Sequence, residues 1–233
     1  MKVPISLPGK GKWPMGRRSS DGVVIIGAGG HGKVVCDALV STGQRILGWV
    51  DDDTSLRGGG VNGFPVLGTQ ADIPDLLKQW GKRRPAFIVA IGDNAQRGAL
   101  FDQLVAGGMR PANAVHRSAV VSPSARLGRG VMILAGAVVN PDTAISDNVI
   151  VNTCASVDHN NLIARDAHLA PGVHTGGNVR IGRAAFLGMG VVVLPDRTIG
   201  AETIVGAGAV VHRDLPDAVV AVGVPARVQR ALR

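Results

Sequence analysis

The second half of the chain carries an aliphatic residue at every sixth position, and this period restricts the possible folds more than any other feature. In steps of six from Val115 to Val211, every position is Val, Ile or Leu except Thr175. An amphipathic helix repeats near 3.6 residues and a half-buried strand near two, so neither produces this spacing. A period of six instead predicts stacked coils of about 18 residues, each with three short strands, that form a triangular prism.

Two further positions of the hexad indicate where the coil turns. The fourth residue after the aliphatic one is usually small, as at Ala137 and Ala155. Glycine often follows the aliphatic residue directly, as at Gly182 and Gly188, where a side chain would obstruct a tight bend. Both preferences predict a corner within every six residues.

The first half of the chain predicts a small α/β domain with a short parallel, Rossmann-like sheet over residues 22–110. Short apolar runs alternate with helical patterns, and Gly107, Gly108 and Pro111 mark the junction that follows. The predicted strands are residues 23–26, 46–50 and 86–91. The predicted helices are residues 33–39, 73–80 and 97–106.

The net charge of +8 does not indicate a nucleic-acid partner. Five of the basic residues lie in the first 20 residues, which hold no acid, so the rest of the chain carries only +3. This stretch predicts a basic flexible leader over residues 1–21, with Met15 as an alternative start. The complete predicted order is this leader, the α/β domain, a β-helix over residues 113–217, and a C-terminal segment over residues 218–233.

Two kinds of sequence signal bear on the compartment. No run of 18 apolar residues and no apolar signal segment is present, so we expect a cytoplasmic protein without a membrane partner. Cys36 and Cys154 form no CxxC pair, and we expect both thiols to be reduced. A zinc site shared by stacked coils would need histidines 18 residues apart, and no two of the six have that spacing, so no metal is expected.

The run GAGGHG over residues 27–32 follows the first predicted strand and precedes a helix. Backbone N–H groups at such a turn suit a phosphate or pyrophosphate, and Asp51 and Asp52 after the second strand could accept hydrogen bonds from a ribose or a base. An ordinary tight turn with solvated carboxylates explains the same residues. A dehydrogenase is disfavoured because only the β-helix follows, with no separate catalytic domain.

Together the two halves resemble the hexapeptide-repeat sugar O-acyltransferases, which include sialic acid O-acetyltransferases. Within them the chain is most similar to the N-acetyltransferases of nucleotide-linked 4-amino-sugars. The similarity covers residues 22–230 and rests on six segments: VVIIGAGGHGKVV, residues 49–52, FPVLGT, AIGDNAQR, NTCASVDHNN and VGVPAR. It implies that the β-helix is left-handed, a hand that the period alone does not determine.

The resemblance also implies a site. His159 would be the general base, with Asn160 standing where these enzymes often have an acid that orients the imidazole. Whether Asp158 supports His159 instead is open. The residues expected to bind acetyl-CoA are His168, Gly188, Met189, Gly206 and Ala207. The residues expected to bind the nucleotide-sugar are Gly29, Gly30, His31, Asp51, Asp52 and Gly92.

The implied activity is acetyl transfer from acetyl-CoA to the amine of a UDP- or GDP-linked amino-sugar, such as a 4-amino-4,6-dideoxy-sugar, for cell-surface polysaccharide or glycan biosynthesis. A homotrimer with its active site between subunits is expected. Asn160 favours N- over O-acetylation, because an uncharged amine needs less help from the base than a hydroxyl does. Sugar O-acetylation and a non-catalytic nucleotide-binding trimeric scaffold remain as alternatives.

Overall fold

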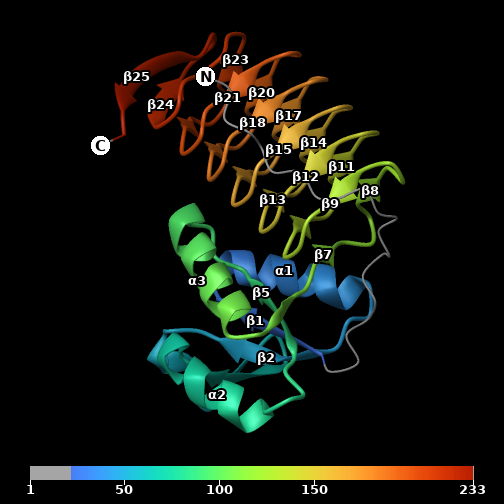
Figure 1. Cartoon of the computed structure of the whole chain (residues 1–233), viewed down its shortest axis with the longest axis vertical. Coiled ribbons are helices and arrows are strands. Elements are labelled where there is room, and N and C mark those ends of the chain that lie inside the picture. Colours follow the sequence, from blue (N-terminus) through green and yellow to red (C-terminus); the bar gives the residue numbers. More distant parts are fainter. Residues whose placement is uncertain (1–21, 233) are drawn as a thin grey trace. The chain divides into compact units, whose positions relative to one another are not determined.

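The computed structural model describes residues 22–232, and these residues divide into two compact units that are each described separately (Figure 1). The first unit ends at Arg117 and the second begins at Ser118. The predicted leader lies outside the described residues. In the part of the chain that is described, no helix is long and apolar enough to cross a membrane. The predicted cytoplasmic location and the four predicted boundaries stay predictions.

The first unit is an α/β domain built on a sheet of order β3-β4-β2-β1-β5-β6. Neighbouring strands are parallel, except that β3 and β4 form an antiparallel pair. The strands of this sheet are β1 (Val23–Ile26), β2 (Ile46–Val50), β3 (Gly60–Val61), β4 (Phe64–Gly68), β5 (Ala86–Val89) and β6 (Arg110–Pro111). Strand β7 (Ala114–Val115) follows in the chain and does not join this sheet. The helices are α1 (Gly30–Ser41), α2 (Ile73–Trp80) and α3 (Asn94–Ala106), with the short 3₁₀ turns η1 (Thr54–Leu56) and η2 (Gln70–Asp72).

Helix α1 begins three residues earlier than predicted, inside the glycine run. Glycine disfavours helix, so the sequence placed the start at Lys33. The structure gives the reason for the glycine: a Cβ on Gly32 would lie 2.0 Å from the carbonyl oxygen of Gly27. The first turn of α1 therefore packs closely against the end of β1, which only glycine permits.

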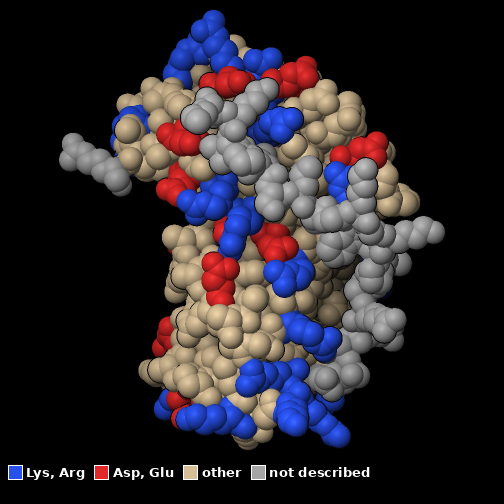
Figure 2. Space-filling model, viewed as in Figure 1, with Lys and Arg blue, Asp and Glu red and all other residues tan. Residues whose placement is uncertain are grey.

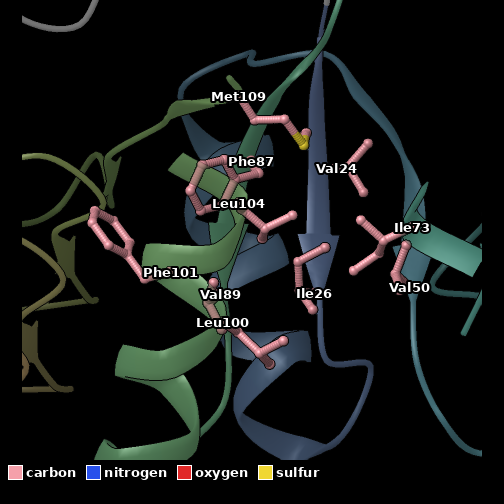
Figure 3. Close-up of a cluster of buried hydrophobic side chains, with 10 residues drawn as sticks. All are labelled: Val24, Ile26, Val50, Ile73, Phe87, Val89, Leu100, Phe101, Leu104 and Met109. Atoms are coloured by element: carbon pink, nitrogen blue, oxygen red, sulfur yellow. The ribbon is translucent and has the colours of Figure 1, made fainter. Parts of the chain in front are cut away.

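Apolar side chains from β1, β2 and β5 pack against those of α2 and α3 to form the core of this unit (Figure 3). Phe87 and Leu104 lie near its centre with 0% and 1% of their surface exposed. The ring centroids of Phe87 and Phe101 are 5.7 Å apart in a tilted arrangement. The sheet is thereby held rigid at the ends of β1, β2 and β5, from which the loops with the predicted nucleotide-sugar residues extend.

The second unit is the predicted left-handed parallel β-helix. Its two-residue strands pair in parallel register with strands 18 residues away, as Val139 does with Val157 and Leu169 with Leu187. Sixteen such strands run from β8 (Val120–Val121) to β23 (Val210–Val211), and β24 (Val219–Val222) and β25 (Arg227–Ala231) complete the unit. The strands between are β9 (Arg126–Leu127), β10 (Met132–Ile133), β11 (Val138–Val139), β12 (Ala144–Ile145), β13 (Ile150–Val151), β14 (Ser156–Val157), β15 (Leu162–Ile163), β16 (His168–Leu169), β17 (His174–Thr175), β18 (Arg180–Ile181), β19 (Phe186–Leu187), β20 (Val192–Val193), β21 (Thr198–Ile199) and β22 (Ile204–Val205).

Three sheets form the walls of the prism. The first contains β10, β13, β16, β19 and β22 and continues into β24 and β25, the second contains β8, β11, β14, β17, β20 and β23, and the third contains β9, β12, β15, β18 and β21. The hexad aliphatic residues fill the interior, where Ile145, Val157 and Leu187 are all fully buried. The sixfold period is thus confirmed, because each step of six residues leads from one wall to the next.

A left-handed backbone conformation recurs once per hexad, and the sequence analysis did not identify this position. From Gly130 to Gly208, the third residue after each aliphatic one has a positive φ. Most of these residues are Gly, Asn or Asp, which tolerate the left-handed region best. The glycines after the aliphatic residue have another cause, because a Cβ on Gly182 would lie 2.4 Å from the backbone nitrogen of Ala201 in the next coil.

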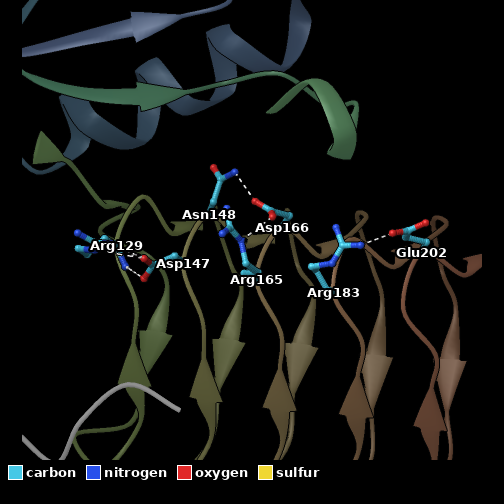
Figure 4. A network of polar contacts seen from close by, with 7 residues as sticks. All are labelled: Arg129, Asp147, Asn148, Arg165, Asp166, Arg183 and Glu202. Atoms are coloured by element: carbon cyan, nitrogen blue, oxygen red, sulfur yellow. Dashed lines mark hydrogen bonds and ion pairs between the residues drawn. The ribbon is translucent and has the colours of Figure 1, made fainter. Parts of the chain in front are cut away.

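Polar side chains form a ladder along the corner that joins the third wall to the first (Figure 4). Arg129 pairs with Asp147 at 2.9 Å, and Arg183 pairs with Glu202. Asp166, with 6% of its side chain exposed, accepts hydrogen bonds from both Asn148 and Arg165. In the upper half of Figure 2, acidic groups stand beside basic ones over the β-helix, so the excess of positive charge forms no single patch there.

The left-handed corner position predicts that replacement of alanine by glycine changes the free energy of unfolding in opposite directions at two adjacent residues. Ala184 has φ +53°, so Ala184→Gly should raise the free energy of unfolding by about 0.5–1 kcal/mol through relief of backbone strain. Ala185 is fully buried, so Ala185→Gly should lower it by about 1–2 kcal/mol. Urea unfolding of both variants measures the two signs, and a loss of stability in both would contradict the strain at Ala184.

Candidate active site

His159 lies on the corner between the second and third walls, in the turn from β14 to β15. Its side chain is exposed, and its Nδ1 lies 3.3 Å from Oδ1 of Asn160. A carboxamide oxygen can only accept, so in this contact Nδ1 carries the proton and donates. The lone pair of the neutral ring is then on Nε2, which is the arrangement a general base needs.

Asn160 occupies the left-handed corner position, with φ +59°. This position favours asparagine for the backbone alone, and it does so on another corner of the prism, at Asn148. The sequence analysis treated Asn160 only as a replacement for an acid. The backbone supplies a second reason for the residue, and the amide still contacts the imidazole.

Asp158 fixes the backbone of the same turn. Its Oδ1 accepts hydrogen bonds from the backbone N–H of His159 at 2.7 Å and from Nδ2 of Asn140 at 3.0 Å. Its own backbone N–H donates to Thr175 at 3.2 Å, and its carbonyl oxygen accepts from Thr143 at 2.8 Å. Asp158 therefore supports His159 through the peptide that carries it, which answers the question the sequence left open.

Buried polar residues lie behind this turn where the hexad pattern predicts apolar or small ones. Thr175, the exception in the aliphatic series, is 5% exposed, and Asn161 is fully buried at a position usually held by a small residue. The amide of Asn161 donates to Oγ1 of Thr175 at 2.7 Å and to the carbonyl oxygen of Gly176 at 3.1 Å. Buried polar groups that are satisfied in this way rigidify their surroundings, so the pattern is broken where the turn that carries His159 is held.

The residues expected to bind acetyl-CoA lie on the first wall and on its corner with the second wall. His168 is on β16 with 7% of its surface exposed, whereas Met189 is 62% exposed on the corner after β19. Gly188 precedes Met189, and Gly206 and Ala207 occupy the matching turn one coil further along. His159 is on a different corner of the prism. The structure of one chain thus groups the five predicted acetyl-CoA residues, but it does not bring them together with His159.

Asn152 determines the tautomer of His168, and the sequence analysis did not single it out. The Oδ1 atom of Asn152 accepts from the backbone N–H of Thr153 at 2.8 Å, so its amide nitrogen faces Nε2 of His168 at 3.2 Å. Nε2 must accept this bond, and the proton of the neutral ring is on Nδ1. Asn152 lies within the NTCASVDHNN segment, and a buried amide in an apolar wall is the signal that could have identified it.

The predicted nucleotide-sugar residues are grouped at the carboxyl ends of β1, β2 and β5. Gly29 is the N-cap of α1 and Gly30 begins it. A Cβ on Gly29, Gly30 or Gly92 would meet no atom within 4 Å, so the space beside these backbones is open. Backbone N–H groups at such a helix start can bind a phosphate.

Asp51 and Asp52 make the loop contacts of this region. Asp51 accepts hydrogen bonds from the backbone N–H groups of Ala28 at 2.6 Å and Asp53 at 2.8 Å, and Asp52 accepts from that of Gln70 at 2.8 Å. These carboxylates build the loops in which a ligand role was predicted. Their direct contact with a ribose or a base stays a prediction.

His31 and Arg97 form the interior of the same region. Burial, together with the nearby Arg97 guanidinium, lowers the pKa of His31 from 6.5 to about 4. The ring is therefore uncharged near neutral pH. Arg97 is fully buried and donates to the carbonyl oxygens of Ile91 at 3.2 Å and Gly92 at 3.3 Å. Arg97 was not predicted, although it ends the AIGDNAQR segment.

Within residues 22–232, no group of three or more His, Cys, Asp or Glu side chains is arranged to hold a metal ion. The β-helix unit presents an exposed imidazole on a turn held by hydrogen bonds. The α/β unit presents open backbone at the start of α1.

Comparison with known proteins agrees with this arrangement. Residues 22–104 match the family described as PglD N-terminal domain, and residues 178–213 match the bacterial transferase hexapeptide repeats. Over 119 residues the chain is 37% identical to UDP-N-acetylbacillosamine N-acetyltransferase of Bacillus subtilis (strain 168). This match spans 48% of the chain and about half, 51%, of that relative.

Two similar crystal structures cover nearly the whole chain. PerB from Caulobacter crescentus in complex with CoA and GDP-perosamine is 47% identical over 90% of this chain and 97% of its own, with a TM-score of 0.83. The acetyltransferase domain of PglB from Neisseria gonorrhoeae FA1090 in complex with acetyl coenzyme A is 39% identical over 88% and 98%, with a TM-score of 0.82. The chain therefore belongs to the hexapeptide-repeat sugar acyltransferases, in the subgroup of nucleotide-linked amino-sugar N-acetyltransferases.

Proposed function

We propose that this protein transfers the acetyl group of acetyl-CoA to the amino group of a nucleotide-linked amino-sugar. The similarity to a Caulobacter perosamine N-acetyltransferase, 46% identity over 90% of the chain, carries this proposal. That structure contains CoA and GDP-perosamine, so a GDP-linked amino-sugar is the first substrate class to test and a UDP-linked one the second. The open backbone at Gly29, Gly30 and Gly92 supports a diphosphate at the start of α1.

In the proposed reaction, the uncharged amine of the sugar attacks the thioester carbonyl carbon. The new C–N bond forms as Nε2 of His159 removes a proton from that nitrogen, and a backbone N–H stabilises the developing oxyanion. Breakage of the C–S bond releases CoA as the thiol, which takes up one proton. The contact between Nδ1 of His159 and Asn160 supports this role because it keeps Nε2 available.

We further propose that the enzyme is a homotrimer whose active site lies between neighbouring β-helices. His159 and the predicted acetyl-CoA residues occupy different corners of one prism, so a second copy is needed to bring them together. The second wall, which ends at the His159 corner, carries valines on its outer side, including Val120, 62% exposed, and Val192. Exposed apolar side chains along a flat sheet are typical of a subunit interface.

The first prediction concerns the activity and its base. Release of free thiol from acetyl-CoA should require a nucleotide-linked amino-sugar, and His159→Ala should lower kcat by about 10²-fold or more, the usual range for a general base. The KM for acetyl-CoA should change little because His159 acts on the amine. Thiol release is measured with a chromogenic thiol reagent, with GDP-perosamine and UDP-linked amino-sugars as acceptors.

His116→Ala is the matched control, because this histidine lies in the other unit, where its Nε2 is 3.6 Å from Asp37. It should retain the normal kcat. No thiol release with any nucleotide-linked amino-sugar would exclude the proposed activity. A normal kcat in His159→Ala would leave the activity in place and exclude the general base.

The neighbour of the base gives a second prediction, in the pH dependence. Asn160→Asp should move the acid limb of the kcat profile to higher pH, because a carboxylate beside the ring stabilises the imidazolium and more of the base is then protonated at a given pH. The left-handed backbone accepts aspartate, so the turn should keep its shape. Asn160→Gly, which suits this backbone but has no side chain, should not move the limb, and an unmoved limb in Asn160→Asp would show that residue 160 does not contact the ring.

The shared site gives a third prediction. Light scattering should give three times the mass of the chain, and Val192→Arg should yield a monomer without activity, since a charge on the second wall opposes association. Val40→Arg, at a residue of α1 that is 49% exposed, is the control and should remain trimeric and active. A monomer that turns over at the full rate would exclude a site shared between subunits.

A further inference from the structure

Gly177 lies one coil beyond His159 and directly against its ring. A Cβ on Gly177 would be 2.5 Å from Cε1, 2.7 Å from Nε2 and 3.1 Å from Nδ1 of His159. All three of the nearest atoms belong to this imidazole. The ring therefore occupies the space that any other residue at position 177 would fill with its side chain.

The backbone does not explain the glycine. Gly177 is absent from the residues with positive φ, unlike Asn178 beside it. The same hexad position holds alanine at residues 135, 201 and 207, and between residues 129 and 207 glycine occurs there only at 177. Alanine is thus compatible with this position of the hexad at the other two corners of the prism. The distinguishing feature at Gly177 is the histidine one coil before it.

Other glycines of the prism serve a different purpose. A Cβ on Gly176 would lie 2.8 Å from the backbone nitrogen of Pro195, and a Cβ on Gly200 would lie 2.3 Å from that of Asp217. A side chain at Gly176 or Gly200 would therefore push against the backbone of the next coil. At Gly177 the obstructed group is an exposed side chain, which can rotate away without disturbing the coil.

The position of Gly177 relative to His159 is held by the backbone. The N–H of Asn178 donates to the carbonyl oxygen of His159 at 3.0 Å, and the N–H of Asp196 donates to that of Gly177 at 3.0 Å. These hydrogen bonds link successive coils at the corner, as the strand pairing links them in the walls. The surface on which the ring rests is consequently as rigid as the β-helix.

We propose that Gly177 is a positioning residue that seats the imidazole of His159 for proton transfer. The inference rests on the proposed role of His159 as general base. An exposed histidine with one 3.3 Å contact to Asn160 has few restraints on its ring, and the α-carbon of Gly177 supplies the missing one. Displacement of a reacting group by about 1 Å can cost on the order of 10²-fold in rate, so the seat affects catalysis more than stability.

The kinetic test is Gly177→Ala. We expect kcat to fall at least tenfold while the KM for acetyl-CoA and the thermal midpoint remain near those of the native enzyme. In a His159→Ala background, the same substitution should change kcat by less than twofold, because no ring remains to displace. Gly182→Ala, which pushes against the backbone of the next coil, is the structural control and should lower the thermal midpoint and act equally in both backgrounds.

A second readout does not depend on activity. With ¹³C-labelled histidine, the Cε1–H resonance of His159 should move in Gly177→Ala while those of the other histidines remain in place. An unmoved resonance together with an unchanged kcat would overturn the seat. A moved resonance in an enzyme whose His159→Ala variant is fully active would support the seat and exclude the general base, so the two proposals fail separately.

Discussion

The parallel pairing of strands in successive coils, in a register of 18 residues, is the interaction on which the β-helix unit depends. The backbone N–H of Leu134 donates to Val151, that of Asn152 to Leu169 and that of Ala170 to Leu187, each at 2.9–3.0 Å. Because every wall repeats this register, side chains at equivalent positions stack in columns. The surroundings of a side chain are therefore set by the residues one coil before and one coil after it in the same column. The contact of the His159 ring with Gly177 follows from this stacking.

Three departures from the repeat lie around the turn that carries His159. Thr175 stands at an aliphatic position and accepts a hydrogen bond from the backbone N–H of Asp158. Asn161 stands at a small or apolar position and donates to Thr175. Gly177 is the single glycine of its column and lies against the ring of His159. A repeat needs only apolar filling and permissive corners, so a polar residue in its interior requires a local reason. Here the reason is to hold one exposed imidazole on a scaffold that does not otherwise position it.

The α/β unit leaves the backbone at the start of α1 open, as the proposed binding of a phosphate requires. Close packing at Gly32 draws the start of α1 against β1, and Asp51 fixes the loop through Ala28. Arg97 is buried and bonds the carbonyl oxygens at the end of β5, while His31 nearby stays uncharged. Arg97 thus places a buried guanidinium beneath the loop that follows β5.

The sequence by itself determined the two-part architecture, the 18-residue coil and the family. A sixfold aliphatic series such as Val139 to Val157 is compatible with few folds, and the segments around His159 are specific to the family. It could not determine which side chains touch across coils, since this depends on how far a ring such as that of His159 reaches over the next turn. The left-handed φ of Asn160, the backbone role of Asp158 and the seat at Gly177 were decided by the tertiary structure. Each is a relation between neighbouring coils or between a side chain and its corner, and a linear spacing specifies neither the direction nor the rotamer of a side chain.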